Sequence, residues 1–144
     1  MYKKMLVAFD GSDAAKTALK NALELATLTK AELKVIHVPH IMGDAVMAGT
    51  MPVQFPASPE MVERAIWEIK DSVEETAEAM GATPPEVLVR SGEPAHEILG
   101  VIKEYDIDLI IMGRRGLGDV TGLLLGSVTH KVQARSQCAV LTLS

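Results

Sequence analysis

The stretch DLIIMGRRGLGDVTGLLLGS, residues 108–127, joins an apolar run to a glycine-rich segment. Asp108–Met112 predicts a strand buried on both faces, because strands of a parallel sheet are almost continuously apolar. The following Gly113–Ser127 holds five glycines in fifteen residues, and a helix is expected from Ser127 to about Ala134. Glycine lets a ligand approach the backbone, and a helix N-terminus presents N–H groups with a partial positive charge. The stretch therefore predicts a phosphate-binding loop in an α/β fold.

The rest of the chain repeats the same strand–helix unit. Four more apolar runs predict strands: Met5–Phe9, Leu33–Val38, Glu86–Arg90 and Ala139–Leu143. Capping residues and apolar residues at helical spacing predict helices: Ser12 to Ala26, Ser58-Pro59 to Gly81, and Ser91 to Tyr105. Without a hairpin signal, this alternation predicts a single α/β domain over residues 1–144. We expect a three-layer, open, parallel five-stranded sheet with helices on both faces, as in Rossmann-like proteins.

Residues 40–57 interrupt the pattern. Glycines and prolines divide this segment, and its apolar residues follow no period. We expect a long mobile loop with at most one helical turn, and loops of this length are usually functional or disordered. Its methionines could form an adaptable surface for a partner or could be loosely ordered filler.

Composition narrows the range of functions. Aromatic residues make up only 3% of the chain, which argues against a stacking platform for single-stranded nucleic acid. The net charge of −5 gives no general attraction to DNA or to a membrane surface. From Gly113 onward, however, four basic residues face one acidic residue, so a small anion would find its positive neighbourhood there. A lone cysteine, Cys138, and the absence of a long apolar run favour a cytoplasmic protein.

Two common phosphate motifs are excluded. No glycine precedes a lysine, so the G-x-x-x-x-G-K-[ST] loop is missing. Gly116-x-Gly118-x-x-Thr121 nearly matches the dinucleotide fingerprint, but it follows the fourth strand, and no acidic residue ends the second strand to hold a ribose. We therefore discount NAD.

The spacing Gly113, two residues, Gly116, nine residues, Gly126-Ser127 resembles the nucleotide-binding pattern of the universal stress protein family. Further matches lie in register along the chain: Asp10 after the first strand, His37-Val38, Gly92-Glu93-Pro94-Ala95, Asp108 to Gly113, Val128-Thr129 and Cys138. One departure is Ala139, where many members carry proline. That position belongs to the last strand and leaves the nucleotide site untouched.

The resemblance implies an adenine nucleotide alpha hydrolase-like fold and an ATP-binding regulatory protein. ATP, AMP or ADP would be the ligand, with Mg²⁺ on the phosphates. The resemblance implies twelve binding residues: Ala8, Phe9, Asp10, Val38, Met112, Gly113, Arg115, Gly116, Gly126, Ser127, Val128 and Thr129. It also implies a homodimer through Ala139–Leu143, an apolar strand whose edge position invites pairing with a second copy.

Other interpretations stay open. The glycine loop could be a surface turn, with Ser127 capping the helix, and Asp10 could be a turn carboxylate rather than a ligand for ribose or metal. His37 and His40 fall short of a zinc set. The chain could be a slow ATPase or a nucleotide-transferring enzyme, but Asp10-Gly11-Ser12-Asp13-Ala14 lacks the Ser-Gly-Gly-x-Asp-Ser loop of related enzymes, and the glycine loop shows no catalytic base. At most we expect slow hydrolysis or autophosphorylation. A third possibility is a nucleotide-independent module that acts by dimerisation.

Overall fold

The computed structural model describes residues 1–40, 42–117 and 125–144, and for residues 42–46 it describes the backbone. The helices and strands are, in chain order, β1 (Lys4–Ala8), α1 (Asp13–Thr29), β2 (Glu32–His37), β3 (Met42–Ala48), β4 (Met51–Pro56), α2 (Pro59–Ala79), β5 (Glu86–Val89), α3 (Pro94–Glu104), β6 (Leu109–Gly113), α4 (Ser127–Arg135) and β7 (Ala139–Leu143).

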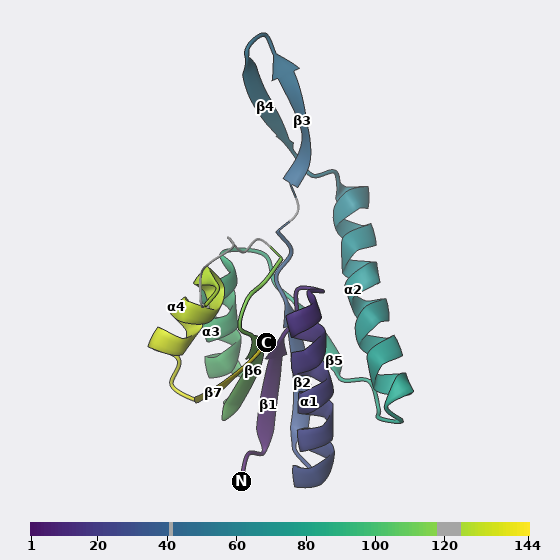
Figure 1. Cartoon of the computed structure of the whole chain (residues 1–144), viewed down its shortest axis with the longest axis vertical. Helices are drawn as coiled ribbons and strands as arrows, with labels where there is room; N and C mark the ends of the chain where they lie inside the picture. Colours follow the sequence, from purple (N-terminus) through teal and green to yellow (C-terminus); the bar gives the residue numbers. More distant parts are fainter. Residues whose placement is uncertain (41, 118–124) are drawn as a thin grey trace.

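Five of these strands form one parallel sheet in the order β5-β2-β1-β6-β7. Helices α1 and α2 pack on one face, and α3 and α4 pack on the other (Figure 1). This confirms the predicted three-layer α/β fold. The chain builds the sheet outward from β1 in one direction and then returns to add β6 on the other side. The strand order therefore reverses between β1 and β6, and ligands of such sheets bind beside this point.

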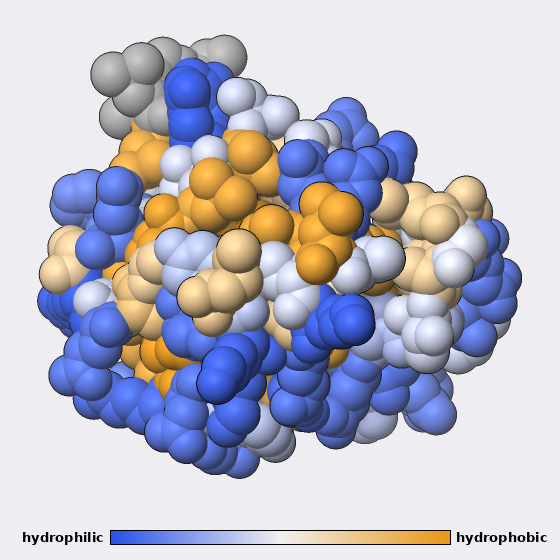
Figure 2. All heavy atoms as spheres, turned by 90° about the horizontal axis from the view of Figure 1, so that it is seen from below, coloured by the Kyte–Doolittle hydropathy of each residue, from blue (hydrophilic) through white to orange (hydrophobic). Residues whose placement is uncertain are grey.

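Two apolar clusters hold the layers together, and β1 contributes to both. Met5 and Val7 face α1 and α2, whereas Leu6 faces α3 and α4. All three side chains are fully buried. This alternation follows from the two-residue period of a strand. Hydrophilic side chains cover most of the periphery in Figure 2, and apolar side chains gather toward the middle of that face. No helix of the described chain is long and apolar enough to cross a membrane.

Serine caps set the starts of α1 and α2 as the sequence predicts, whereas α3 begins at Pro94 with Glu93 as its N-cap rather than at Ser91. The Ser12 hydroxyl accepts a hydrogen bond from Ala15 N at 3.2 Å, and the Ser58 hydroxyl accepts one from Met61 N at 3.3 Å. The expectation that Ser127 caps α4 is wrong. Gly126 occupies the N-cap position, and Ser127 is the first helical residue. Its exposed hydroxyl is therefore not used as a helix cap.

The expected loop at residues 40–57 is instead a β-hairpin, and we call residues 42–56 the arm. Its strands β3 and β4 are antiparallel and joined by the two-residue turn Gly49-Thr50, where Gly49 has a φ of +66°. In Figure 1 the arm projects from the body beyond the N-terminal end of α2. Residues 40–57 carry no strong hairpin signal, because Gly49-Thr50 is not one of the Asn-Gly or Asp-Gly pairs typical of tight turns, and two prolines interrupt β4.

Candidate functional site

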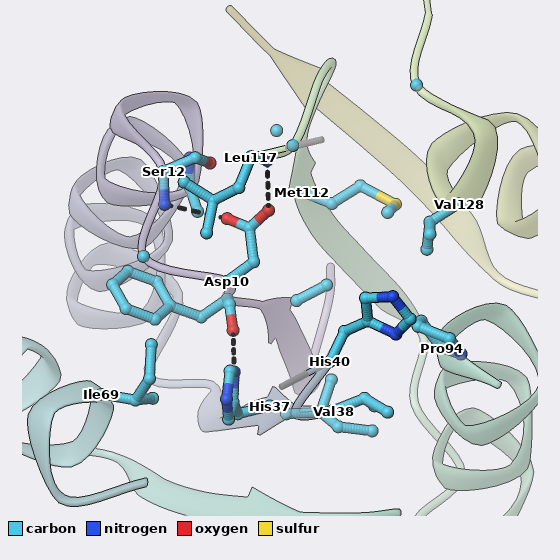
Figure 3. Close-up of a pocket in the computed structure, with 18 of the residues that line it drawn as sticks. Asp10, Ser12, His37, Val38, His40, Ile69, Pro94, Met112, Leu117 and Val128 are labelled. Atoms are coloured by element: carbon cyan, nitrogen blue, oxygen red, sulfur yellow. Dashed lines mark hydrogen bonds between the residues drawn. The ribbon is translucent and has the colours of Figure 1, made fainter. Parts of the chain in front are cut away.

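The carboxyl ends of β1, β2 and β6 border a pocket of about 980 Å³, beside the reversal of strand order (Figure 3). All twelve residues predicted from the sequence line it: Ala8, Phe9, Asp10, Val38, Met112, Gly113, Arg115, Gly116, Gly126, Ser127, Val128 and Thr129. The strands bring these residues together because the carboxyl ends of parallel strands meet at one edge of a sheet. The pocket lies in the upper part of the 300–1,000 Å³ range typical of small-molecule sites.

Asp10 connects the end of β1 to the glycine loop. Its Oδ1 accepts a hydrogen bond from Ser12 N at 2.9 Å, and its Oδ2 accepts one from Leu117 N at 3.2 Å. Both bonds are visible in Figure 3. Asp10 therefore acts as a turn carboxylate, one of the two roles considered for it from the sequence. The second bond, across 107 residues of sequence, also fixes the start of the glycine loop over β1.

The two stems of the glycine loop are held together at their base. Arg114 N donates to Leu143 O at 2.6 Å, and Gly126 N donates to Arg114 O at 2.8 Å. The buried hydroxyl of Thr129 donates to Gly113 O at 2.9 Å, so this side chain ties α4 to β6. These bonds place the N-terminus of α4 directly beside the end of β6. Residues 118–124 of the predicted loop lie outside the described chain.

A side chain would be unfavourable at both Gly113 and Gly116, but for different physical reasons. A Cβ at Gly113 would lie 2.9 Å from Ala14 Cβ and 3.2 Å from Ala14 C, so β6 and α1 pack too closely for a side chain. A Cβ at Gly116 would lie 2.6 Å from Asp10 Oδ2, directly above the pocket. Gly113 is thus a packing glycine, whereas Gly116 keeps the surface beside Asp10 open.

The pocket has a polar rim and apolar walls. Gly126 begins α4, and no side chain of the described residues caps this helix, whose N-terminus carries a partial positive charge of about half a unit. The exposed side chain of Arg115 adds a full positive charge at the same rim. Ala8, Val38 and Met112 supply apolar wall surface at the strand ends. This arrangement suits a ligand with one flat apolar part and one anionic part.

Several lining residues were not predicted, among them His37, His40, Ile69, Pro94 and Leu117. His37 is buried, and because Phe9 O can only accept, His37 Nδ1 donates to it at 2.8 Å. His37 ends β2 and His40 follows it closely, and this position was the one signal in the sequence that could have placed them at the pocket. Ile69 belongs to α2, and its approach depends on tertiary packing. Within residues 1–40, 42–117 and 125–144, no group of three metal-ligating side chains is present.

Glu93 links the two helices on one side of the pocket. Its side chain accepts from His96 N at 2.7 Å and pairs with Lys131 Nζ at 2.9 Å, so it joins the start of α3 to α4. The Lys131 ammonium, and then the His96 N–H, lower the pKa of Glu93 below its ordinary 4.5. A lowered folded-state pKa means that the charged form contributes stability above pH 4.5, and that this contribution is lost as the pH falls through the folded-state value.

Replacing Glu93 by glutamine should destabilise the fold at pH 7 by about 0.5 kcal/mol, the usual size for an exposed ion pair. The amide can still accept from His96 N, so the helix cap is kept and the charge interaction alone is lost. Urea unfolding at pH 7 and pH 3 measures the difference, which should shrink at the lower pH. In a Lys131→Met background the substitution should have little effect at either pH. A difference that is the same at both pH values would contradict this role.

The fold and the pocket together define an open-sheet α/β protein with a ligand site where the strand order reverses. The chain belongs to the universal stress protein family, whose model matches residues 1–144. It is 38% identical to universal stress protein YxiE of Bacillus subtilis over 146 residues, which cover 98% of each chain. A universal stress protein of Thermus aquaticus is also 38% identical, with the same coverage.

Solved structures agree with this assignment. Protein MJ0577 superposes with a TM-score of 0.74 at 26% identity, covering 99% of this chain and 96% of its own. A universal stress protein solved in complex with cAMP gives a TM-score of 0.72 at 28% identity, with the same coverage. A universal stress protein from Archaeoglobus fulgidus, solved in complex with dAMP, gives 0.69 at 25% identity and covers 99% of this chain and 98% of its own. Members of this fold thus include nucleotide-binding proteins.

Proposed function

We propose that this protein is an adenine-nucleotide-binding regulator, with ATP as its ligand and AMP or ADP as weaker alternatives. The observation that carries the proposal is that all twelve residues expected from the family pattern line one pocket. The relatives solved with cAMP and dAMP support a nucleotide as the class of ligand.

The proposed ligand lies across the pocket with its base at the strand ends. The adenine lies against Ala8, Val38 and Met112, and the ribose lies toward Asp10 and Gly116. The phosphates face Gly126, Ser127 and the N-terminus of α4. Hydrogen bonds to charged groups contribute roughly 1.5–3 kcal/mol each, so four or five would contribute roughly 6–15 kcal/mol, a range that includes the roughly 8 kcal/mol of micromolar binding.

Mg²⁺ fits this site only together with the nucleotide phosphates. Mg²⁺ keeps several waters and usually takes one or two carboxylates from the protein. Asp10 is the carboxylate beside the proposed ribose, and the described residues hold no larger acidic cluster. We therefore expect Mg²⁺ to strengthen ATP binding and to show no strong binding by itself.

The proposed output is a change in conformation or association rather than turnover. Among the described residues of the glycine loop, 113–117 and 125–127, no side chain could serve as a catalytic base, and the nearby Asp10 carboxylate already accepts two backbone N–H bonds. We expect slow hydrolysis or autophosphorylation at most. Turnover above about 1 s⁻¹, the low end of ordinary enzymes, would favour the enzymatic alternative.

A homodimer through β7 forms part of the proposal. This strand lies at the edge of the sheet, and its Leu141 side chain is 38% exposed. An apolar edge strand offers unpaired backbone groups to a second copy. We further propose a cytoplasmic location, in keeping with the single, unpaired Cys138.

Thermal unfolding and titration calorimetry test the nucleotide site directly. ATP with Mg²⁺ at 100 times its Kd should raise the stability by about 2.7 kcal/mol, equivalent to a Tm increase of about 10 °C for a chain of this size. CTP at equal concentration serves as the control for base recognition. Absence of both binding heat and a Tm shift at millimolar ATP would reject the site and favour the nucleotide-independent module.

A further inference from the structure

The arm exposes an apolar surface that the body of the chain does not cover. All six residues of β4 are exposed, and in Figure 1 the arm stands clear of the sheet and its helices. Met51, Val53 and Phe55 alternate along β4 and so share one face, with exposed fractions of 70%, 41% and 54%. A two-stranded hairpin is marginally stable in water, whereas three or more strands with an apolar face can be stable. The arm therefore requires further strands or a covering surface.

The two edges of the arm differ in their capacity to pair. Met47 and Pro52 lie opposite each other, and proline has no N–H, so this pair cannot exchange two hydrogen bonds. In an antiparallel ladder, the pairs that do not exchange bonds direct their backbone groups outward. Pro52 therefore leaves the outer edge of β4 without a donor at that position. Met47, directly across, directs its N–H and C=O outward from β3.

The outer edge of β3 is thus equipped to accept another strand. Ala45 lies two residues before Met47 and pairs with Gln54, so its backbone groups also point outward. No proline occurs in Met42–Ala48, whereas β4 contains Pro52 and Pro56. Proline on an edge strand blocks pairing with a further strand, so an added strand is expected at the edge that has no proline.

We propose that β3 pairs with β3 of a second copy of this chain, which makes a four-stranded antiparallel sheet, β4-β3-β3-β4, between two molecules. Identical edges are self-complementary about a twofold axis. In a register centred on Val46, Ala45 of each copy pairs with Met47 of the other. The exposed apolar face of β4 then becomes part of a larger continuous face.

Charge favours a second copy over a charged partner. The arm, residues 42–56, contains one acidic residue and no basic residue, whereas the whole chain has a net charge of −5. Two copies repel each other over most of their surface, and this repulsion is weakest at the nearly uncharged arm. This interface involves neither β7 nor the pocket, so it stands independently of the proposed function.

The decisive variant is Met47→Pro, compared with Met47→Leu. Proline removes the outward N–H of β3 but no bond of the internal ladder, whereas leucine keeps the N–H and an apolar side chain. Light scattering coupled to size exclusion, at concentrations from 5 to 500 μM (roughly the range in which weak interfaces assemble), gives the molar mass. The wild type and Met47→Leu should show twice the mass of Met47→Pro if Met47→Pro is a monomer, and at least twice its mass if β7 also forms a dimer.

Circular dichroism and the ATP-dependent Tm shift check that each variant is folded. These measurements should be the same for all three proteins, and they report on the nucleotide site separately from the arm. Equal molar mass for the wild type and Met47→Pro over the whole concentration range would overturn the proposal. Such a result would mean that the arm lies against its own chain or receives a segment of a different protein.

Discussion

Replacing Gly116 by valine should abolish the rise in unfolding temperature that ATP produces. A Cβ at this position would lie 2.6 Å from Asp10 Oδ2, so the valine side chain would displace that carboxylate and occupy the surface where the ribose and phosphates are proposed to lie. Loss of two hydrogen bonds to charged groups costs roughly 3–6 kcal/mol, so the affinity should fall by at least about 100-fold. Titration calorimetry with ATP and Mg²⁺ measures the loss.

The same variant contains its own control for folding. Gly116 is exposed, but displacing Asp10 gives up its bonds to Ser12 N and Leu117 N, so the unfolding temperature without nucleotide should fall modestly, and the ATP-dependent shift is taken from each variant's own baseline. Gly116→Ala adds a Cβ without branching and should weaken ATP binding less than valine does. A Gly116→Val protein that keeps the full ATP-dependent shift would show that the nucleotide, if bound, lies elsewhere.

Replacing Gly113 by alanine should instead lower the stability of the fold itself. The new methyl group would meet the side chain and backbone of Ala14 in α1, and Arg115 O at 3.1 Å. Since backbone cannot move aside as a flexible side chain can, the strand end and helix start must separate. Overpacking of this kind costs about 1–3 kcal/mol. Urea unfolding without nucleotide should show the loss, and ATP binding should fall only as far as the pocket edge shifts.

Gly100→Ala is the matched control for Gly113→Ala. Gly100 lies within α3, and a Cβ there would have no neighbour within 4 Å. Alanine in a helix interior is favoured over glycine by about 0.5–1 kcal/mol, so this variant should be slightly more stable than the wild type. Equal effects from the two substitutions would mean that β6 and α1 tolerate an added side chain, and that the glycine is present for the ligand alone.

The sheet could be predicted from sequence because its central strands, β1 and β6, are apolar on both faces. The run Leu109–Met112 is buried throughout, and the last strand, Ala139–Leu143, has the predicted bounds. The first strand runs from Lys4 to Ala8, one residue before the expected Met5–Phe9. Apolar residues indicate which part of a strand is buried, whereas the strand's bounds are set by its backbone hydrogen bonds to neighbouring strands. Strand–helix alternation then left few possible topologies.

The sequence predicted which residues gather at the candidate site but not the contacts that they make. Strand ends and glycine spacing brought all twelve residues to the pocket. Contacts between distant segments were not predictable, as shown by the bond from Leu117 N to Asp10 and the pair of Glu93 with Lys131. Serine is common at the N-cap, so the sequence favours Ser127 there, whereas Gly126 fills that position in the structure. The arm was not predictable because Pro52 and Pro56 interrupt the alternating apolar residues of β4, and proline argues against a strand.

The pairing of Met42 with Pro56 brings the two ends of the arm to neighbouring positions, with Cα atoms about 5 Å apart as in any antiparallel pair. The chain thus leaves the body and re-enters it through one narrow neck. A segment of quite different length could be grafted across that neck without moving β2 or α2, because loop closure depends only weakly on length. The arm is therefore an exchangeable module, and a peptide tag or a second binding domain inserted at its Gly49-Thr50 tip would be displayed away from the pocket.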